Sequence, residues 1–444
     1  MNKRKTWQRI FDEHPYISTA LNNDGWIVLT ADELRVYGEP RILAKIDSFE
    51  TLPKVFKKHN AALLSLTNDS YIILKLGQEG KPLFPKLPPV TTPPRYYSPQ
   101  DLQDRFVTLD WQRHFTSESQ ALDAAFLAGI LQDFTQDNEL YLTIRGRRRL
   151  ATPIALQFSI PSGSSLSFPQ SIQGVQIEVD AGYESPRHVY LVEAKKRLQT
   201  TFNLRQVYFP FAHWQAYLQN KRSAKTIRPL YLLYTAHQYF LYEFSIRPSG
   251  NLNDISVKHS QWYVLGEPPL TLGDLSQIVQ ATASTFVPHI PFPQADNLSR
   301  VFNILERIAH QPQMSAEEIA QEEAIVVRQG NYYLSALRWL GWLEGKGTHK
   351  KLTKEGRRVL KASAIERPQR LIRVLASRPV FRQAIQQWSQ TQNIPSQKQI
   401  EQWIFQETKR KHISPLADST IPRRAQTVRA WLQNLTVWVR TTSV

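Results

Sequence analysis

Residues 175–196 constrain the fold more than any other stretch of the chain. They read V-Q-I-E-V-D-A-G-Y-E-S-P-R-H-V-Y-L-V-E-A-K-K, two apolar-rich runs joined by residues 185–188. Serine first and proline second are favoured in a four-residue turn, so the pattern predicts a β-hairpin. Side chains alternate between the two faces of a strand, which places Glu193 and Lys195 on the face of the preceding apolar residues. Charges there cost several kcal/mol unless they find partners.

The hairpin register suggests what those partners are. A two-residue loop places Asp180 opposite Glu193 and Glu178 opposite Lys195, with Cβ atoms about 4.5–5.5 Å apart. Two carboxylates at that separation repel each other unless a cation lies between them, and Mg²⁺ takes oxygen ligands in this way. Gly182 would leave room for a substrate backbone. Proline is not favoured in such a short loop, so the register stays open at this point.

An Asp followed thirteen residues later by Glu193-Ala194-Lys195 resembles the PD-(D/E)xK nuclease superfamily, the fold of many type II restriction endonucleases. The resemblance implies that Asp180 and Glu193 bind the metal, with the Ala194 carbonyl as a further ligand, and that Lys195 is catalytic. Val179 departs from the family pattern, which has proline there. The competing interpretation is a solvated strand end in which Lys195 pairs with Glu178.

Two more residues match positions that the superfamily uses. Ser117 and Gln120 have the spacing of a helix capping box, and Glu118 opens the inward-facing stripe of that helix. Glu118 resembles the acid that the superfamily places on the helix before its sheet. Alternatively, it only stabilises the helix N-terminus electrostatically. Gln206, on a predicted helix at 202–217, resembles a residue that supports the site, although core packing explains the aromatic residues of that helix better.

The order of predicted elements agrees with this resemblance. A helix from 117, a strand at 140–144, the hairpin, the helix at 202–217 and strands at 230–234 and 239–246 follow one another. This is the order of a restriction-endonuclease-like core, a mixed β-sheet flanked by helices. The fold class expected for the chain is therefore α/β (α+β), with several domains.

Composition limits the alternatives. A length of 444 residues suggests about three domains, and 41% hydrophobic residues can build proper cores. The longest apolar runs are well short of the roughly 18 residues that a membrane span requires, and the basic N-terminus leads into no apolar signal core. Without cysteine the chain has no disulfides and no thiolate zinc site. A cytoplasmic location is the default expectation.

Four domains are expected, and proline-rich stretches at 79–100 and 284–297 mark the first two boundaries between them. The first is a small α/β domain with its linker, in which the sequence indicates no chemistry; contact with DNA and a scaffolding role both stay open for it. The segment at 79–100 is expected to be a plain spacer, and the alternative is that it lies along a neighbouring domain. The nuclease domain follows, then a winged helix-turn-helix domain and an Arg-rich helical domain. Their expected bounds are 1–95, 96–290, 296–365 and 366–444.

Positive charge accumulates toward the C-terminus. The chain carries a net charge of +17, and residues 296–444 hold 24 Lys and Arg against 12 Asp and Glu. Such a surplus suggests a polyanionic partner.

Residues 296–365 resemble a winged helix-turn-helix domain, and a winged helix that contacts protein is the alternative. In that resemblance, polar residues that open the third helix reach base edges in the major groove, and wing lysines contact phosphates. The residues expected to bind DNA are Arg328, Gln329, Asn331, Tyr332, Lys346, Lys350 and Lys351, with Arg423 and Arg424 facing outward from a later helix.

The resemblance implies a type II restriction endonuclease-like enzyme. Such an enzyme would hydrolyse phosphodiester bonds of double-stranded DNA at a short sequence, with Mg²⁺ as cofactor or Mn²⁺ as its substitute. It also implies a homodimer and a cognate DNA methyltransferase in a restriction-modification pair. Two alternatives stay open: a repair or mobile-element endonuclease of the same fold, and a non-catalytic winged-helix regulator that binds DNA.

Overall fold

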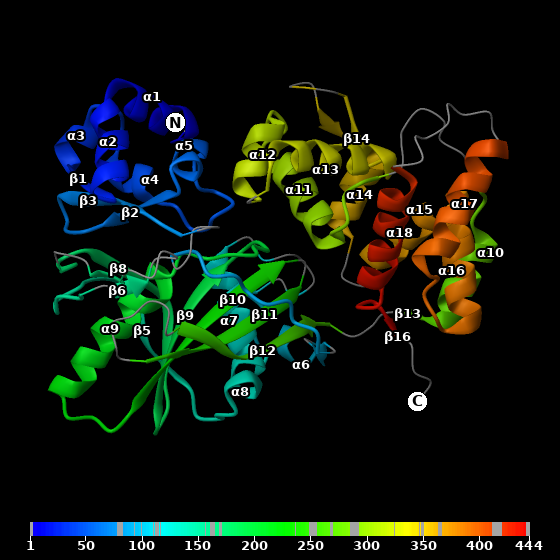
Figure 1. The fold of residues 1–444 in the computed structure, drawn as a ribbon. Coiled ribbons are helices and arrows are strands. Elements are labelled where there is room, and N and C mark those ends of the chain that lie inside the picture. The colour runs from blue at the N-terminus through cyan, green and yellow to red at the C-terminus, as the bar shows by residue number, and fades with distance from the viewer. Residues whose placement is uncertain are drawn as a thin grey trace. The chain divides into compact units, whose positions relative to one another are not determined.

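The computed structural model forms two compact units. Unit 1 comprises residues 1–92, 117–234 and 240–262, and unit 2 comprises residues 93–116, 235–239 and 263–444 (Figure 1). The structure describes residues 3–440 apart from residues 78–82, 93, 99, 110, 112–114, 116, 156, 160–164, 168–170, 236, 248–254, 267–269, 285–292, 324, 346, 348–349, 363–365 and 411–419.

Unit 1 begins with a small three-stranded antiparallel sheet and short helices. The sheet has the order β1-β3-β2, and the predicted strands near 26 and 71 and the helix at 54 are confirmed. Trp7 meets Phe56 edge-on at 4.8 Å between ring centroids, which packs the first helix onto the fifth. The elements are α1 (Lys3–Glu13), α2 (Pro15–Asn23), β1 (Trp26–Thr30), α3 (Ala31–Arg35), α4 (Pro40–Ala44), α5 (Lys54–Lys58), β2 (Ala61–Ser65) and β3 (Ser70–Lys75).

A seven-stranded mixed sheet follows, with the order β4-β12-β11-β10-β9-β8-β5. Strands β5, β8 and β9 pair antiparallel, whereas β9 and β10 pair parallel across the connecting helix α9. The expected mixed α/β architecture is confirmed at this level. The elements are β4 (Arg95–Tyr97), α6 (Gln100–Gln103), α7 (Glu118–Leu127), α8 (Ile130–Thr135), β5 (Tyr141–Arg149), β6 (Gln157–Ser159), β7 (Ser165–Ser167), β8 (Gln176–Glu184), β9 (His188–Lys195), α9 (Arg205–Asn220), β10 (Thr226–Thr235), β11 (Gln238–Ile246) and β12 (Ile255–Leu265).

The predicted hairpin is β8–β9, in the predicted register. Ala181 pairs with Val192 and Glu184 with Val189, while Ser185 and His188 close the turn through their backbones at 2.9 Å. The prediction that Gly182 leaves room for a substrate is wrong. A Cβ there would lie 2.6 Å from the Cβ of Ile144, so the glycine allows β5 to approach β8 closely.

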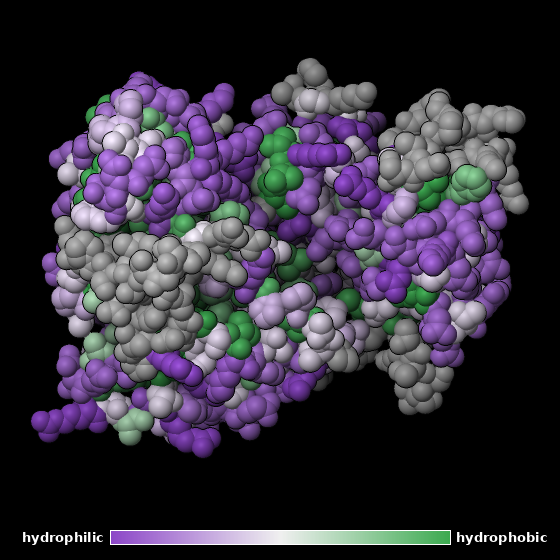
Figure 2. All heavy atoms as spheres, in the orientation of Figure 1, coloured by the Kyte–Doolittle hydropathy of each residue, from purple (hydrophilic) through white to green (hydrophobic). Residues whose placement is uncertain are grey.

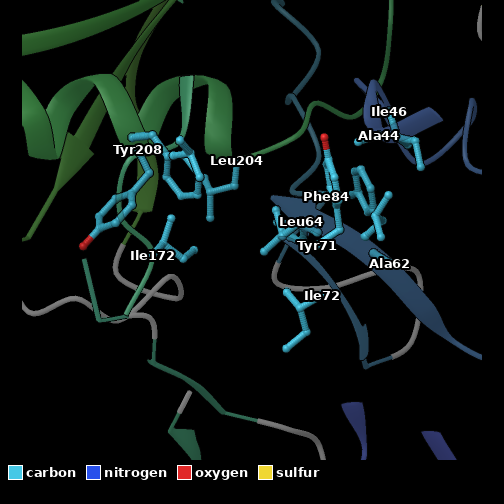
Figure 3. Packing of buried hydrophobic residues seen from close by; sticks show 14 of the residues in the cluster. Ala44, Ile46, Ala62, Leu64, Tyr71, Ile72, Phe84, Ile172, Leu204 and Tyr208 are labelled. Carbon is cyan, nitrogen blue, oxygen red and sulfur yellow. The ribbon is translucent and has the colours of Figure 1, made fainter. Parts of the chain in front are cut away.

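One hydrophobic core joins both parts of unit 1. It contains residues of the N-terminal sheet together with residues of β8, β9, α9 and β10. Figure 3 shows part of it, with Leu64, Tyr71 and Phe84 on one side and Leu204 and Tyr208 on the other. The two parts are therefore packed as one body rather than linked loosely.

The chain from 83 to 87 contributes to that core. The backbone N–H of Leu204 donates to the carbonyl of Leu83 at 2.9 Å, and that of Leu87 donates to Thr200 at 2.8 Å. Leu83 and Phe84 are buried. The expectation of a plain spacer is wrong for this stretch, because its backbone pairs with residues 200–204.

Unit 2 is mainly helical and has its own hydrophobic core. Helices α11, α12 and α13 are followed by the antiparallel strands β14 and β15, in agreement with the predicted order, and Ser315 and Glu318 form the predicted capping box. Residues of α15, α16 and α18 share that core. The elements are β13 (Leu270–Thr271), α10 (Leu272–Ala281), α11 (Leu298–His310), α12 (Ala316–Glu322), α13 (Val327–Trp339), β14 (Leu343–Glu344), β15 (Lys351–Leu352), α14 (Lys354–Lys361), α15 (Glu366–Ala376), α16 (Pro379–Thr391), α17 (Gln397–Arg410), α18 (Ile421–Leu435) and β16 (Val439–Arg440).

Hydrophilic residues dominate the face of the molecule seen in Figure 2. Exposed large apolar residues include Tyr16 of α2, Tyr217 of α9 and Phe405 of α17. Within the described ranges, no helix is both long and apolar enough to cross a membrane.

Candidate active site

One cavity of unit 1 brings the predicted catalytic side chains together. Asp180 of β8, Glu193 and Lys195 of β9, Glu118 at the start of α7 and Gln206 at the start of α9 all line it. Its volume is about 440 Å³. Four elements therefore deliver to one place five residues that the sequence separates by up to 88 positions (from 118 to 206).

The strands part where the acids begin. The β8–β9 ladder ends at Ala181 and Val192, and just beyond it an Asp180 carboxylate oxygen accepts a hydrogen bond from the backbone N–H of Ala194 at 2.7 Å. This side-chain contact takes the place of a main-chain pair, so the end of the hairpin stays ordered while the carboxylates face the cavity. Asp180 and Glu178 alternate with buried Val179, as a strand requires.

Lys195 lies against Glu193. Its Nζ donates to a Glu193 carboxylate oxygen at 2.5 Å and to the Ala194 carbonyl at 3.1 Å, and both side chains are only 11% exposed. The alternative pairing of Lys195 with Glu178 is wrong, because Glu178 instead pairs with Arg147 of β5 at 3.3 Å. The lysine therefore belongs to the cavity rather than to a solvated strand end.

Burial and crowding raise the pKa of both acids. The pKa of Asp180 is raised chiefly by burial, which outweighs the opposing charge of Lys195 and the Ala194 hydrogen bond. The pKa of Glu193 rises to about 8 for the same first reason, with Asp180 and Asp47 adding to it. Burial opposes the charge on Lys195, yet Glu193 and the other acids hold its pKa well above the usual value. The lysine stays charged while its acids resist ionisation.

Glu118 and Gln206 contact the other members of the group. A Glu118 carboxylate oxygen accepts from the backbone N–H of Lys196 at 3.1 Å, so this acid does more than stabilise the start of its helix. The amide nitrogen of Gln206 donates to Glu193 at 2.8 Å, while its amide oxygen is buried without a partner among the described residues. Both side chains thus contact β9 or the residue that follows it.

Asp47 is a member of the site that sequence reasoning missed. It follows α4, lines the same cavity and accepts from the amide nitrogen of Gln206 at 3.4 Å. Burial alone would raise its pKa, but the charges of Lys195, Arg197 and Arg205 outweigh burial and lower it. No local pattern could have identified Asp47, since its partners lie some 150 positions further along the chain.

The cavity fits a hard divalent cation. Asp180, Glu193 and the Ala194 carbonyl present only oxygen atoms, the ligands that Mg²⁺ prefers, and both carboxylates are crowded enough that a cation would stabilise their charge. The orphaned oxygen of Gln206 adds a further polar group. Within the described part of the chain no three His, Cys, Asp or Glu residues form a metal-binding group by themselves. A Mg²⁺ ion here would therefore keep several water ligands.

A second polar cleft lies in unit 2, at the start of α13. It has a volume of about 270 Å³ and is lined by Arg328, Gln329 and Tyr332 of α13 together with Arg423 of α18. Asn331 is exposed beside it. The structure thus groups most of the predicted DNA-binding residues of α13 with one arginine of the later helix.

Two residues that were predicted to contact DNA are buried rather than exposed, so these two predictions are wrong. Lys350 is 4% exposed, because its ammonium group turns inward to the Gly347 carbonyl. Arg424 is 7% exposed and faces the core side of α18, whereas Arg423 beside it is exposed. Lys351 is exposed and pairs with Glu344 across β14 and β15 at 3.5 Å. Lys346 lies outside the described residues.

Comparison with known proteins gives three matches to family models, each described as a domain of unknown function. DUF6996 matches residues 4–73, DUF6997 matches residues 84–264 and DUF7226 matches residues 300–440. The second match includes every predicted catalytic residue. No curated protein and no solved structure matches the chain.

Proposed function

We propose that the chain is a Mg²⁺-dependent endodeoxyribonuclease of the PD-(D/E)xK type, resembling type II restriction endonucleases. The observation that carries the proposal is the single cavity that Asp180, Glu193 and Lys195 share with Glu118 and Gln206. The surrounding order of α7, β5, the β8–β9 hairpin, α9 and the parallel strand β10 supports a restriction-endonuclease-like core.

In this proposal the side chains divide the work on a phosphodiester bond. Asp180, Glu193 and the Ala194 carbonyl would hold Mg²⁺, which lowers the pKa of a water molecule and stabilises negative charge on the phosphate. Lys195 keeps its proton and neutralises charge at the scissile phosphate or orients the attacking water. Gln206 fixes the Glu193 carboxylate, and Glu118 anchors the backbone at Lys196.

Unit 2 would supply affinity and base readout. Helices α11 to α13 followed by β14 and β15 have the order of a winged helix-turn-helix domain, and Arg328, Gln329, Asn331 and Tyr332 stand where a recognition helix reaches base edges. Double-stranded DNA is the substrate, a homodimer would cut both strands, and a cognate methyltransferase would protect the host DNA.

The test is cleavage of unmethylated plasmid DNA by the purified protein with Mg²⁺, with EDTA, and as Asp180→Ala. Discrete fragments that require Mg²⁺ and vanish in the variant are expected, and sequencing their ends gives the target. Asp32→Ala is the matched control, because Asp32 lies on the exposed helix α3 and does not line the cavity. This control should cleave like the unaltered protein.

Two other outcomes would favour the alternatives. Cleavage confined to branched or damaged DNA would point to a repair or mobile-element endonuclease of the same fold. DNA binding without cleavage of several unmethylated substrates, unchanged by Lys195→Ala, would replace the proposal with a non-catalytic regulator.

A further inference from the structure

The N-terminal part of unit 1 forms a second wall of the cavity. Arg41 of α4, Lys45 just after it, and Thr67 and Asn68 of the β2–β3 turn line the cavity that also contains Asp180. The sequence indicates no chemistry in this region. Its side chains nevertheless lie around the same space as the predicted catalytic acids.

This wall carries positive charge without ion-pair partners. Arg41 and Lys45 are exposed, and across the described residues neither side chain takes part in an ion pair. The acid of the same wall, Asp47, is already surrounded by Lys195, Arg197 and Arg205. The wall therefore presents two cations, Arg41 and Lys45, that form no ion pair with a carboxylate of the described residues.

The start of α9, beside this wall, adds a further cation. Arg205 opens α9 and lines the cavity, and it forms no ion pair within the described ranges. Arg147 of β5 lines the cavity as well, but Glu178 holds it at 3.3 Å. The cavity is thus lined by cations as well as acids. Acids alone would repel a phosphodiester, whereas cations beside them attract the phosphates next to the reacting one.

Hydrogen bonds fix the N-terminal wall to the start of α9. The side-chain amide of Asn203 donates to the Ile46 carbonyl at 2.8 Å, and its backbone N–H donates to the Asp47 carbonyl at 2.7 Å. The backbone N–H of Phe49 donates to the hydroxyl of Thr201 at 2.9 Å. The segment that carries Lys45 and Asp47 is thereby held against the residues that lead into Arg205 and Gln206.

We propose that this wall binds the backbone of the strand being cut, with Arg41 and Lys45 contacting phosphates next to the one at Asp180 and Glu193. This inference rests on the proposed nuclease function and gives the N-terminal region its role. A cavity of about 440 Å³ holds a drug-sized ligand, so it admits a short segment of one strand rather than a whole duplex. The ligand recognised is a single-strand phosphodiester backbone, independent of base sequence.

Two double variants with equal charge change test this wall. Arg41→Ala with Lys45→Ala removes the two cations of the N-terminal wall, and Lys54→Ala with Lys58→Ala removes two exposed cations of α5 that do not line the cavity. Binding of a short DNA duplex is measured by fluorescence anisotropy from 50 to 300 mM NaCl without metal. The slope of log affinity against log salt should fall by about 2 in the wall variant, since each phosphate contact contributes about 0.9. The α5 variant should keep its slope.

A second measurement locates the contact. For the unaltered protein, kcat/KM should be roughly tenfold or more lower on a duplex with an uncharged methylphosphonate beside the cleaved bond than on the ordinary duplex. For the wall variant, kcat/KM should be the same on both duplexes. Arg41→Lys should retain most of the salt slope, because it keeps the charge.

The outcomes separate the two proposals. The proposed backbone contact would be wrong if the wall and α5 variants had equal salt slopes, even if the protein cleaves DNA. It would also be wrong if the methylphosphonate lowered kcat/KM of the wall variant as much as that of the unaltered protein. If the wall variant had a reduced salt slope but the unaltered protein never cleaved DNA, both the nuclease function and the binding of a cut strand would be wrong.

Discussion

The two polar clefts of this molecule differ in the exposure of the charged side chains that the sequence predicts to be functional, which are largely buried in unit 1 and exposed in unit 2. In unit 1, Glu193 and Lys195 are each 11% exposed and contact each other inside the cavity. In unit 2, Arg328, Gln329 and Arg423 are exposed, and Lys351 is 73% exposed. Burying a charged pair costs desolvation free energy that its mutual attraction only partly offsets, whereas exposed charges cost little.

That difference indicates two kinds of work. Buried opposed charges have altered pKa values and strong interactions, which suits them to chemistry on a bound phosphate. Exposed cations and amides keep their hydration until a partner arrives, which suits them to recognising a long polyanion. Variants in the cavity should therefore affect cleavage and metal binding, whereas variants in the cleft of unit 2 should affect binding of DNA.

The largest effect is expected from Lys195→Ala. Losing the ammonium group that contacts Glu193 should lower the cleavage rate about 100- to 1,000-fold, since removing one positioned donor that stabilises developing charge costs about 10²–10³-fold. Affinity for DNA should change little. The matched control is Lys225→Ala, because Lys225 pairs with Glu184 at the other end of the same hairpin. Equal losses in both variants would indicate that the hairpin is merely destabilised.

The second effect concerns pH and metal. Glu193, with a pKa of about 8, must lose its proton to bind Mg²⁺, so the Mg²⁺ affinity of the unaltered protein should rise about tenfold per pH unit between pH 6 and 8. Isothermal calorimetry measures this rise, and Glu193→Gln should abolish it. An affinity independent of pH would show that Glu193 is not a ligand.

The same group affects stability without metal. Its pKa in the folded protein lies above the ordinary value of 4.5, so the unfolded chain releases the proton first as pH rises. The free energy of unfolding should therefore decrease between about pH 5 and 8, and thermal denaturation of Glu193→Gln should lack that decrease.

The smallest effect compares two arginines of unit 2. Arg328 is exposed at the start of α13, and Arg328→Ala should weaken binding of the preferred DNA about tenfold without changing the melting temperature. Arg424 is buried on α18, and Arg424→Ala should leave binding intact but lower the free energy of unfolding by about 1–2 kcal/mol through lost packing. The reverse pattern in DNA-binding and melting assays would mean that burial does not separate recognition from structure here.

Sequence predicted the parts of the site that depend on local pattern. The β8–β9 hairpin, the capped helix that begins at Glu118 and the order of α11 to α13 all follow from turn chemistry, capping and periodicity. The burial of Arg424 and Lys350 could not be predicted in this way. The spacing of arginines and lysines does not show which of their aliphatic stems pack against the core.

Long-range features were also out of reach. Asp47 joins the site only through partners in β9 and α9, and Gly182 serves contact with Ile144 of a distant strand. Strand β12, which extends the sheet beyond β11, was not anticipated because its exposed polar residues mask the strand pattern.

The contact between Asp47 and Gln206 has a consequence for how this protein is made. Its two ends are 159 positions apart, so at about 5–20 residues per second the ribosome needs on the order of 10 s to synthesise the chain between them. The N-terminal region cannot complete its shared core before residues 200–204 emerge. Until then the nascent chain holds only fragments of the cavity. On the proposed function, the nuclease centre would thus be incomplete until residues 200–206 are made, and a chain interrupted earlier would be unable to cut the DNA of its own cell.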